Sequence, residues 1–203
     1  MSEKIMLVLK FIFAALLIPL VIGTVMALRA EISRLDMLSQ AAIYTGTLVY
    51  VLMKFFVYDL DAVYKFGQGI VGFCFQFLKP MMNFAPYVIP VYTILGIIAY
   101  AVFHATGALE GREPLGLVLI GAIAFTFAMH VVLTAQDLYK KDTLPGKPNY
   151  CFAMALIFIV DVFLMAILMG MAGKGFSFVD FFQKLGNASA HIYWAVFKQL
   201  FGA

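Results

Sequence analysis

The stretch "FIFAALLIPLVIGTVMAL", residues 11–28, decides the class of fold because none of its residues is charged. An α-helix rises about 1.5 Å per residue, so about 20 apolar residues cross the hydrocarbon core of a bilayer, which is about 30 Å thick. The stretch therefore predicts a transmembrane helix, with a kink at Pro19. Lys10 interrupts the apolar run before it, so we expect a retained span rather than a cleaved signal peptide.

The rest of the chain is nearly as apolar and carries few charges. Hydrophobic residues make up 64% of the 203 residues and charged residues 12%, whereas soluble domains carry about 25% charged residues. The net charge of +3 is too small and too scattered for a nucleic-acid surface. The composition predicts an integral membrane protein. Its expected partners are the lipid bilayer and either other membrane protein subunits or further copies of itself.

Apolar runs recur between short polar loops. They predict an all-α fold, a polytopic transmembrane helical bundle of five or six spans in residues 1–175, because backbone in lipid must satisfy its own hydrogen bonds. Five spans are expected at 5–28, 38–57, 86–106, 115–135 and 150–172. The stretch 62–84 either crosses the membrane, re-enters it or lies at its surface. Counts of Lys and Arg in the loops do not fix the orientation and favour a cytoplasmic N-terminus only slightly.

The C-terminal segment, residues 176–203, has a different pattern. Its polar residues recur at spacings of 4, 3, 4 and 7, which form one stripe on a helix: Asp180, Lys184, Asn187, His191 and Lys198. Aromatic and aliphatic side chains occupy the rest of the segment. This pattern is typical of an amphipathic helix, or of two short helices broken near Gly186, at the membrane interface, and the alternative is a helix that docks on another protein.

Three polar side chains within the expected spans are candidates for an intramembrane polar site. Asp161 lies in the middle of the fifth span, and a carboxyl group in the bilayer is costly unless it is neutralised or paired. It predicts either a proton or ion site or a buried hydrogen bond between helices. His130 and His104 lie toward the ends of the fourth and third spans, and each is more often a packed histidine than a ligand. The spacing of these residues is not typical of a metal site.

The stretch "YKFGQGIVGF", residues 64–73, places Gly67, Gln68, Gly69 and Gly72 in this apolar setting. Glycine lowers the stability of a helix, but it also lets another helix backbone approach closely, as in many membrane proteins. The spacing matches G-x-G-x-x-G, yet no strand precedes it, so a dinucleotide site is not expected. The four residues predict a helix-packing or partner interface.

Four blocks around this stretch resemble the M50-like, site-2-protease-type family of bacterial membrane zinc metallopeptidases. The blocks are "FFVYDLDAVYKFGQGIVGFCF", "APYVIPVYTILGIIAYAVF", "AFTFAMHVVLTAQDLYKKD" and "FAMALIFIVDVFLMAILMGMAGKGFSFVDFF". In that family a helix following Y-x-F-G carries H-E-x-x-H, and a segment of the form APY-x-x-P-x-Y comes next. The resemblance covers roughly residues 50–182. It implies a multi-pass protein of the bacterial inner (plasma) membrane.

The chain lacks the catalytic groups of that family. By position, Gln68 stands at the first histidine, Gly69 at the glutamate and Gly72 at the second histidine. In the motif, two histidines at i and i+4 hold zinc and the glutamate activates a water molecule. A glutamine amide is a poor zinc ligand, and glycine offers neither ligand nor base. The resemblance therefore implies a pseudoprotease with no catalytic residue, no metal and no cofactor.

These observations support a first hypothesis and two alternatives. In the first, the protein is a non-catalytic structural or regulatory subunit of a larger membrane protein complex, which binds its partner through the glycine-bearing helix and the nearby aromatic residues Phe73, Phe75 and Phe77. In the second, it is a small transporter or channel component that uses Asp161 with His130 or His104 as a proton or ion site. In the third, it is a metalloprotease with unorthodox ligands.

Overall fold

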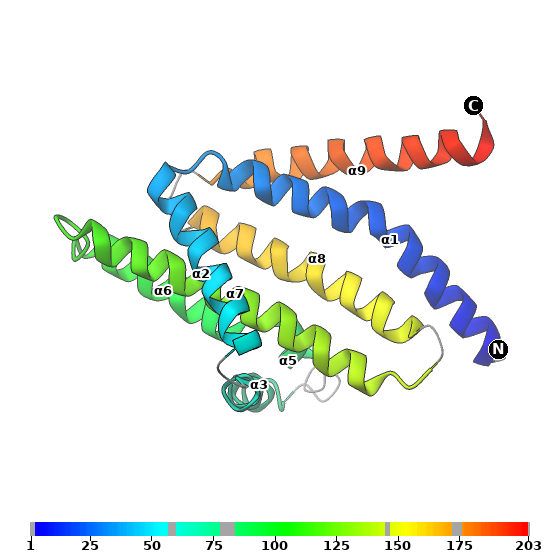
Figure 1. Ribbon diagram of the computed structural model, residues 1–203, viewed down its shortest axis with the longest axis horizontal. Helices are drawn as coiled ribbons and strands as arrows, with labels where there is room; N and C mark the ends of the chain where they lie inside the picture. Colours follow the sequence, from blue (N-terminus) through cyan, green and yellow to red (C-terminus); the bar gives the residue numbers. More distant parts are fainter. Residues whose placement is uncertain (1–2, 57–59, 78–83, 145–146, 172–175, 203) are drawn as a thin grey trace. The chain divides into compact units, whose positions relative to one another are not determined.

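The computed structural model describes the whole chain except residues 1–2, 57–59, 78–83, 145–146, 172–175 and 203. The described residues form helices and no strand, which confirms the predicted all-α class for this part of the chain (Figure 1). The helices are α1 Glu3–Ile32, α2 Met37–Phe56, α3 Asp61–Cys74, α5 Ala85–Val88, α6 Val91–Ala105, α7 Glu113–Lys141, α8 Pro148–Met171 and α9 Phe178–Phe201.

Three of these helices are long and apolar enough to cross a membrane, namely α1, α7 and α8. The helices α2 and α3 qualify only together, as a pair bent by 119°. The helix α6 is apolar but has 15 residues, about 22 Å of helix, which is shorter than the hydrocarbon core. The described helices thus indicate a membrane protein with three or four candidate spans. The expected five or six spans are not confirmed.

Prolines divide the expected span at residues 86–106. Pro86 lies in the first turn of α5, where its missing N–H would have had no helical partner. Ile89 is extended, with φ −104° and ψ 105°, as expected for a residue that precedes a proline. Pro90 then stands directly before α6. The stretch 62–84 forms only the short helix α3 within its described residues, and 78–83 lie outside them.

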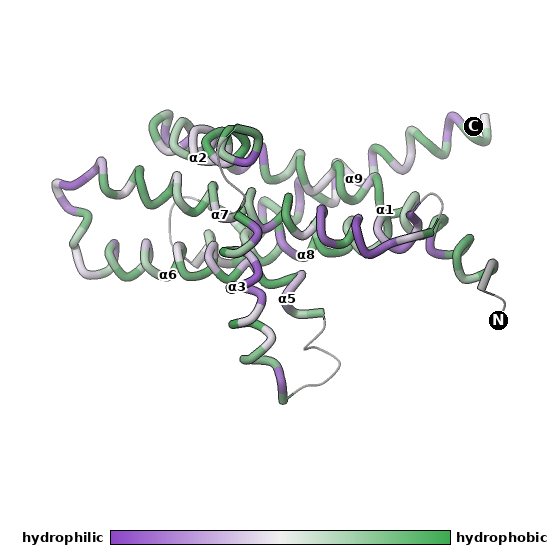
Figure 2. Tube along the Cα trace, turned by 60° about the horizontal axis from the view of Figure 1, so that its bottom comes forward, coloured by the Kyte–Doolittle hydropathy of each residue, from purple (hydrophilic) through white to green (hydrophobic). Residues whose placement is uncertain are grey.

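The described residues form two compact units, each considered by itself. The first unit contains α1, the end of α7 from Ala135, α8 and α9, and the second contains α2, α3, α5, α6 and α7 up to Thr134. In the second unit a buried cluster joins three helices through Tyr50, Tyr64, Met129 and Leu133. Figure 2 shows hydrophobic residues along most of α6 and α7, with hydrophilic residues at the turn that joins them.

In the first unit α9 runs antiparallel to α1 and lies beside its second half (Figure 1). The hydroxyl of Ser177 accepts a hydrogen bond from the backbone N–H of Asp180 and so caps the start of α9, as serine commonly does at helix N-termini. Phe181, which is fully buried, packs edge-on against Phe163 of α8. The predicted amphipathic segment is therefore a helix. Its location at the membrane interface stays a prediction.

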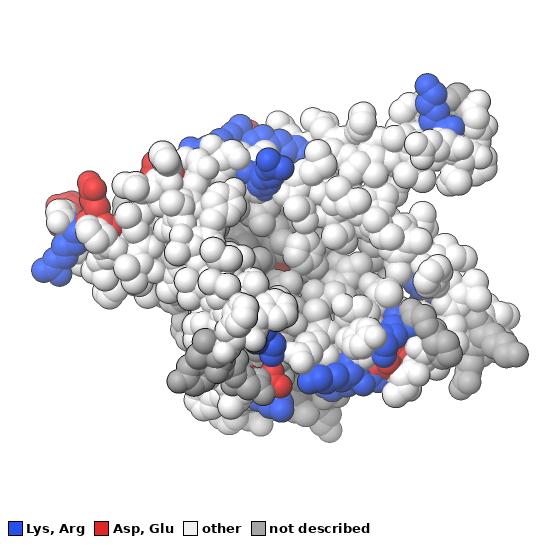
Figure 3. All heavy atoms as spheres, in the orientation of Figure 1, with Lys and Arg blue, Asp and Glu red and all other residues white. Residues whose placement is uncertain are grey.

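Charged side chains are sparse on the face shown in Figure 3, and they gather in separate patches with uncharged surface between them. Many large apolar side chains are exposed on the helices, among them Phe11, Leu48, Ile98 and Val118. A soluble monomer rarely exposes so much apolar surface, whereas lipid covers it at no cost.

Candidate functional site

The glycine-rich helix α3 has two faces with different surroundings. Gly67 is buried, and a Cβ atom on it would lie 2.7 Å from the ring of Tyr92 and 2.9 Å from Val91. Both distances are too short for real atoms, so only glycine allows α6 to approach this closely. Among the described residues, a Cβ atom on Gly69 or Gly72 would meet nothing within 4 Å. The structure therefore uses Gly67 for internal packing and leaves the opposite side of α3 open.

A chain of hydroxyl and amide groups connects α3 to α7. The amide nitrogen of Gln68 donates a hydrogen bond to the Tyr64 hydroxyl at 2.7 Å. That hydroxyl also lies 2.7 Å from the hydroxyl of Thr134, where both side chains are buried. Buried polar groups are stable only when they are hydrogen-bonded, and these three satisfy one another. Gln68, which stands where the M50-like motif has its first histidine, is thus part of a structural network.

His130 lies close to this network. Its Nε2 atom is 3.1 Å from the backbone carbonyl of Tyr87, and its side chain is buried beside the ring of Tyr64. A cavity of about 10 Å³ lies among these residues and Gln68, room for about one water molecule. His130 therefore ties α7 to α5, and the space around it is too small for a substrate.

Gln68, Gly69 and Gly72, at the positions of the H-E-x-x-H motif, do not fit a zinc ion. The side chain of Gln68 is engaged with Tyr64, while Gly69 and Gly72 have no ligand atoms. Within the described ranges, no three His, Cys, Asp or Glu side chains are grouped as a metal site requires. The donor set that the M50-like resemblance would need is thus absent from this helix.

The three residues of the predicted intramembrane polar site are divided between the two units. Asp161 is fully buried in α8, which belongs to the first unit, whereas His130 and His104 belong to the second. His104 stacks on Tyr100 and lines an open crevice of about 440 Å³ with Glu110, Glu113 and other residues. His130 borders a different cavity, so the structure does not bring the two histidines together.

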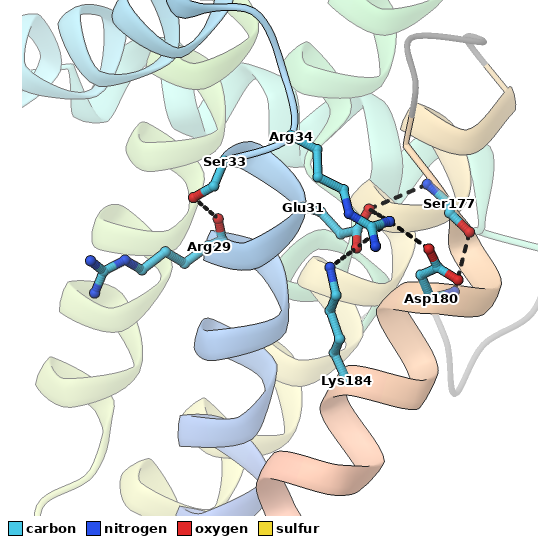
Figure 4. A network of polar contacts seen from close by, with 7 residues as sticks. All are labelled: Arg29, Glu31, Ser33, Arg34, Ser177, Asp180 and Lys184. Carbon is cyan, nitrogen blue, oxygen red and sulfur yellow. Dashed lines mark hydrogen bonds and ion pairs between the residues drawn. The ribbon is translucent and has the colours of Figure 1, made fainter.

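A third polar group, at the end of α1, was missed by the sequence analysis (Figure 4). The side chain of Glu31 is fully buried, and its Oε1 atom accepts a hydrogen bond from the Lys184 ammonium at 2.6 Å. Arg34 lies 3.3 Å from the same carboxylate and 2.5 Å from Asp180. The four charges compensate one another. The only signal in the sequence was the stripe on residues 176–203, which includes Asp180 and Lys184 but does not reveal their partners.

The ion pair between Arg34 and Asp180 shifts both groups toward their charged forms. The hydrogen bond from Arg34 lowers the pKa of the Asp180 carboxyl below its ordinary value. In turn, the hydrogen bond to Asp180 raises the pKa of the Arg34 guanidinium. An opposite charge within hydrogen-bond distance favours the ionised state of each partner. This group is therefore an electrostatic clamp between α1 and the start of α9.

Comparisons of the chain with protein families, with curated proteins and with solved structures found no match.

Proposed function

We propose that the protein is a non-catalytic subunit of a membrane protein complex and that it binds another membrane protein through the outer face of α3. This face consists of Ala62, Lys65, Phe66, Gly69, Gly72 and Phe73. On a helix with 3.6 residues per turn these positions lie on one side, opposite the buried Tyr64, Gly67 and Val71.

One observation carries this proposal, the contrast between Gly67 and its two neighbours. Gly67 has a packing partner within its own unit, whereas Gly69 and Gly72 have none within 4 Å in the part of the chain that the structure describes. Two glycines in an exposed helix cost about 1 kcal/mol each relative to alanine and bring no internal contact in return. Between the exposed rings of Phe66 and Phe73 they form a shallow strip where a second helix can approach closely.

The scaffold in this proposal is a degenerate M50-like protein of the bacterial inner membrane, with five or six spans. The hydrogen-bonded Gln68 supports the loss of the zinc centre, since its amide now completes a structural network. Elemental analysis of the purified protein tests the loss. Stoichiometric zinc would contradict the proposal and favour a surviving metalloprotease.

The partner interface is tested by replacing Gly69 with Leu and purifying the protein from native membranes in mild detergent. Leucine has room within the chain, so the variant should fold normally yet lose its partner in quantitative mass spectrometry. Ala15→Leu, at an exposed site on α1, is the matched control and should keep the partner. If the partner is retained by Gly69→Leu as well, the outer face of α3 is not the interface.

A second candidate function rests on Asp161, which is fully buried within the apolar helix α8. A carboxyl group at such a position is typical of proton and ion pathways, so a small transporter or channel component is the alternative. Reconstituted vesicles that contain the wild type and Asp161→Asn test it. Flux that depends on Asp161 would support transport, and the absence of flux from both proteins would dismiss it.

A further inference from the structure

The helix α9 begins beside the end of α1, where Lys184 binds Glu31, and continues past the middle of α1. A Cβ atom on Gly23 would be 3.1 Å from the backbone nitrogen of Ser189 and 3.2 Å from the carbonyl oxygen of Leu185. Further along, the Tyr193 hydroxyl donates a hydrogen bond to the carbonyl oxygen of Leu16. Residues 185–193 of α9 are therefore level with residues 16–23 of α1.

Two polar contacts on α1 lie on either side of this level. Lys10, two turns inside α1, donates a hydrogen bond to the side chain of Asn149 at 2.7 Å, and Glu31, at the end of α1, binds Lys184. The segment between Lys10 and Glu31 measures about 31 Å at 1.5 Å per residue, which matches a hydrocarbon core about 30 Å thick. Residues 16–23 occupy the middle of that segment, so residues 185–193 lie near mid-membrane if α1, a candidate span, crosses the bilayer between Lys10 and Glu31.

The side of α9 that faces away from α1 is polar at this depth. Its exposed residues, here called the outer face of α9, are Gln183, Gly186, Asn187, Ala190, His191 and Trp194. Asn187 stands between Leu185 and Ser189 along the helix, and His191 between Ser189 and Tyr193. The side chains of Asn187 and His191 make no hydrogen bond within the described part of the chain.

Lipid tails cannot satisfy such groups. A polar group in the hydrocarbon core without a hydrogen-bond partner costs several kcal/mol, and transmembrane helices relieve this cost by pairing polar side chains across a helix contact. We propose that the outer face of α9 is a helix-docking surface inside the membrane and that its occupant is α9 of a second copy of this chain. This proposal selects the protein-docking alternative for the segment over the interfacial one, and it is independent of the outer face of α3.

The chemistry of this face fits a second copy because it is self-complementary. A symmetric contact places the same side chains opposite one another. The amide of Asn187 both donates and accepts hydrogen bonds, and the imidazole of His191 has two ring nitrogens that form hydrogen bonds. Gly186 and Ala190, one turn apart, directly precede Asn187 and His191 in the chain and add little bulk beside them; a Cβ atom on Gly186 would meet no described atom within 4 Å. Two copies of α9 can therefore approach closely and satisfy both polar groups.

Disulfide cross-linking in proteoliposomes that contain only this protein tests the contact. The two native cysteines, the exposed Cys74 and the half-buried Cys151, are first replaced by Ser and Ala. Ala190→Cys should then give a covalent dimer of twice 22.5 kDa upon oxidation. Ile18→Cys, exposed on α1 within the matched range 16–23, should give none. Equal cross-linking of the two variants, or none at Ala190, would overturn the proposal.

Two further measurements distinguish loss of the contact between two α9 helices from misfolding of the variant. Asn187→Leu should weaken dimerisation about tenfold, since one interhelical hydrogen bond is lost. Asn187→Gln should retain most of it, and neither change should alter the melting temperature of the monomer. A membrane-impermeant maleimide should not label Ala190→Cys. Rapid labelling would place this face in water and contradict the proposal.

Discussion

The carboxylate of Glu31 binds the ammonium group of Lys184 at 2.6 Å, although 153 positions separate the two residues in the chain. The Glu31 side chain is fully buried, while that of Lys184 is 31% exposed. A buried charge is costly without a partner, so this pair fixes where α9 begins along α1. The register between the two helices follows from this contact.

Loss of the Glu31 carboxylate should destabilise the first unit. Glu31→Gln leaves the amine of Lys184 without its counter-charge, and we expect a loss of about 1–3 kcal/mol in the free energy of unfolding. Lys198→Met, which removes a charge far from the clamp, should have no measurable effect. Thermal unfolding in detergent measures both. Equal stabilities of the two variants would show that the clamp contributes nothing.

The ion pair between Arg34 and Asp180 should also make the stability of the folded protein depend on pH. The pKa of Asp180 in the folded protein is lower than its ordinary value of 3.8, so its stabilisation is fully present above that value and is lost as the pH falls through the lowered pKa. The difference in melting temperature between wild type and Asp180→Asn should therefore be constant from about pH 7 to pH 5 and shrink as the pH falls below 3.8. A difference that persists undiminished at pH 3 would contradict the ion pair with Arg34.

Two glycines should respond in opposite ways to the same substitution. Gly23→Ala introduces a Cβ atom into the contact with Ser189 and Leu185, and overpacking of this kind costs about 1–3 kcal/mol. Gly69→Ala meets no atom within 4 Å and should stabilise α3 by about 0.5–1 kcal/mol. Chemical denaturation of the purified protein distinguishes the two. Ser189→Gly should partly rescue Gly23→Ala, and a failure of this rescue would mean that the cost arises elsewhere.

The hydroxyl of Tyr64 should contribute more to the stability of the fold than the hydroxyl of an exposed tyrosine. Tyr64→Phe leaves both Gln68 and Thr134 without their shared partner, which should cost about 1–3 kcal/mol in stability. Tyr44→Phe, at a residue 55% exposed, is the control and should be neutral. If Tyr64→Phe is neutral too, the network around Gln68 does not stabilise the second unit.

The sequence predicted where most helices lie because apolar runs are local signals, but it did not predict the break at Ile89 and Pro90 within the expected span 86–106. It failed where a distant residue decides the structure. "RAEISRLD", residues 29–36, has the composition of a polar loop, yet α1 continues to Ile32 because Lys184 neutralises Glu31 from another helix. Likewise, the three glycines of α3 look alike in sequence. Only the approach of Tyr92 separates the packed Gly67 from the open Gly69.

Photo-cross-linking in native membranes tests the proposed partner surface most directly. Benzoylphenylalanine would replace Phe73, 71% exposed on the outer face of α3, or as a control Phe13, 54% exposed on α1. The account predicts that Phe73 forms an adduct with one distinct membrane protein and that Phe13 does not. The absence of any protein adduct at Phe73, or the same adducts at both sites, would contradict the central claim that this chain serves as a partner-binding subunit.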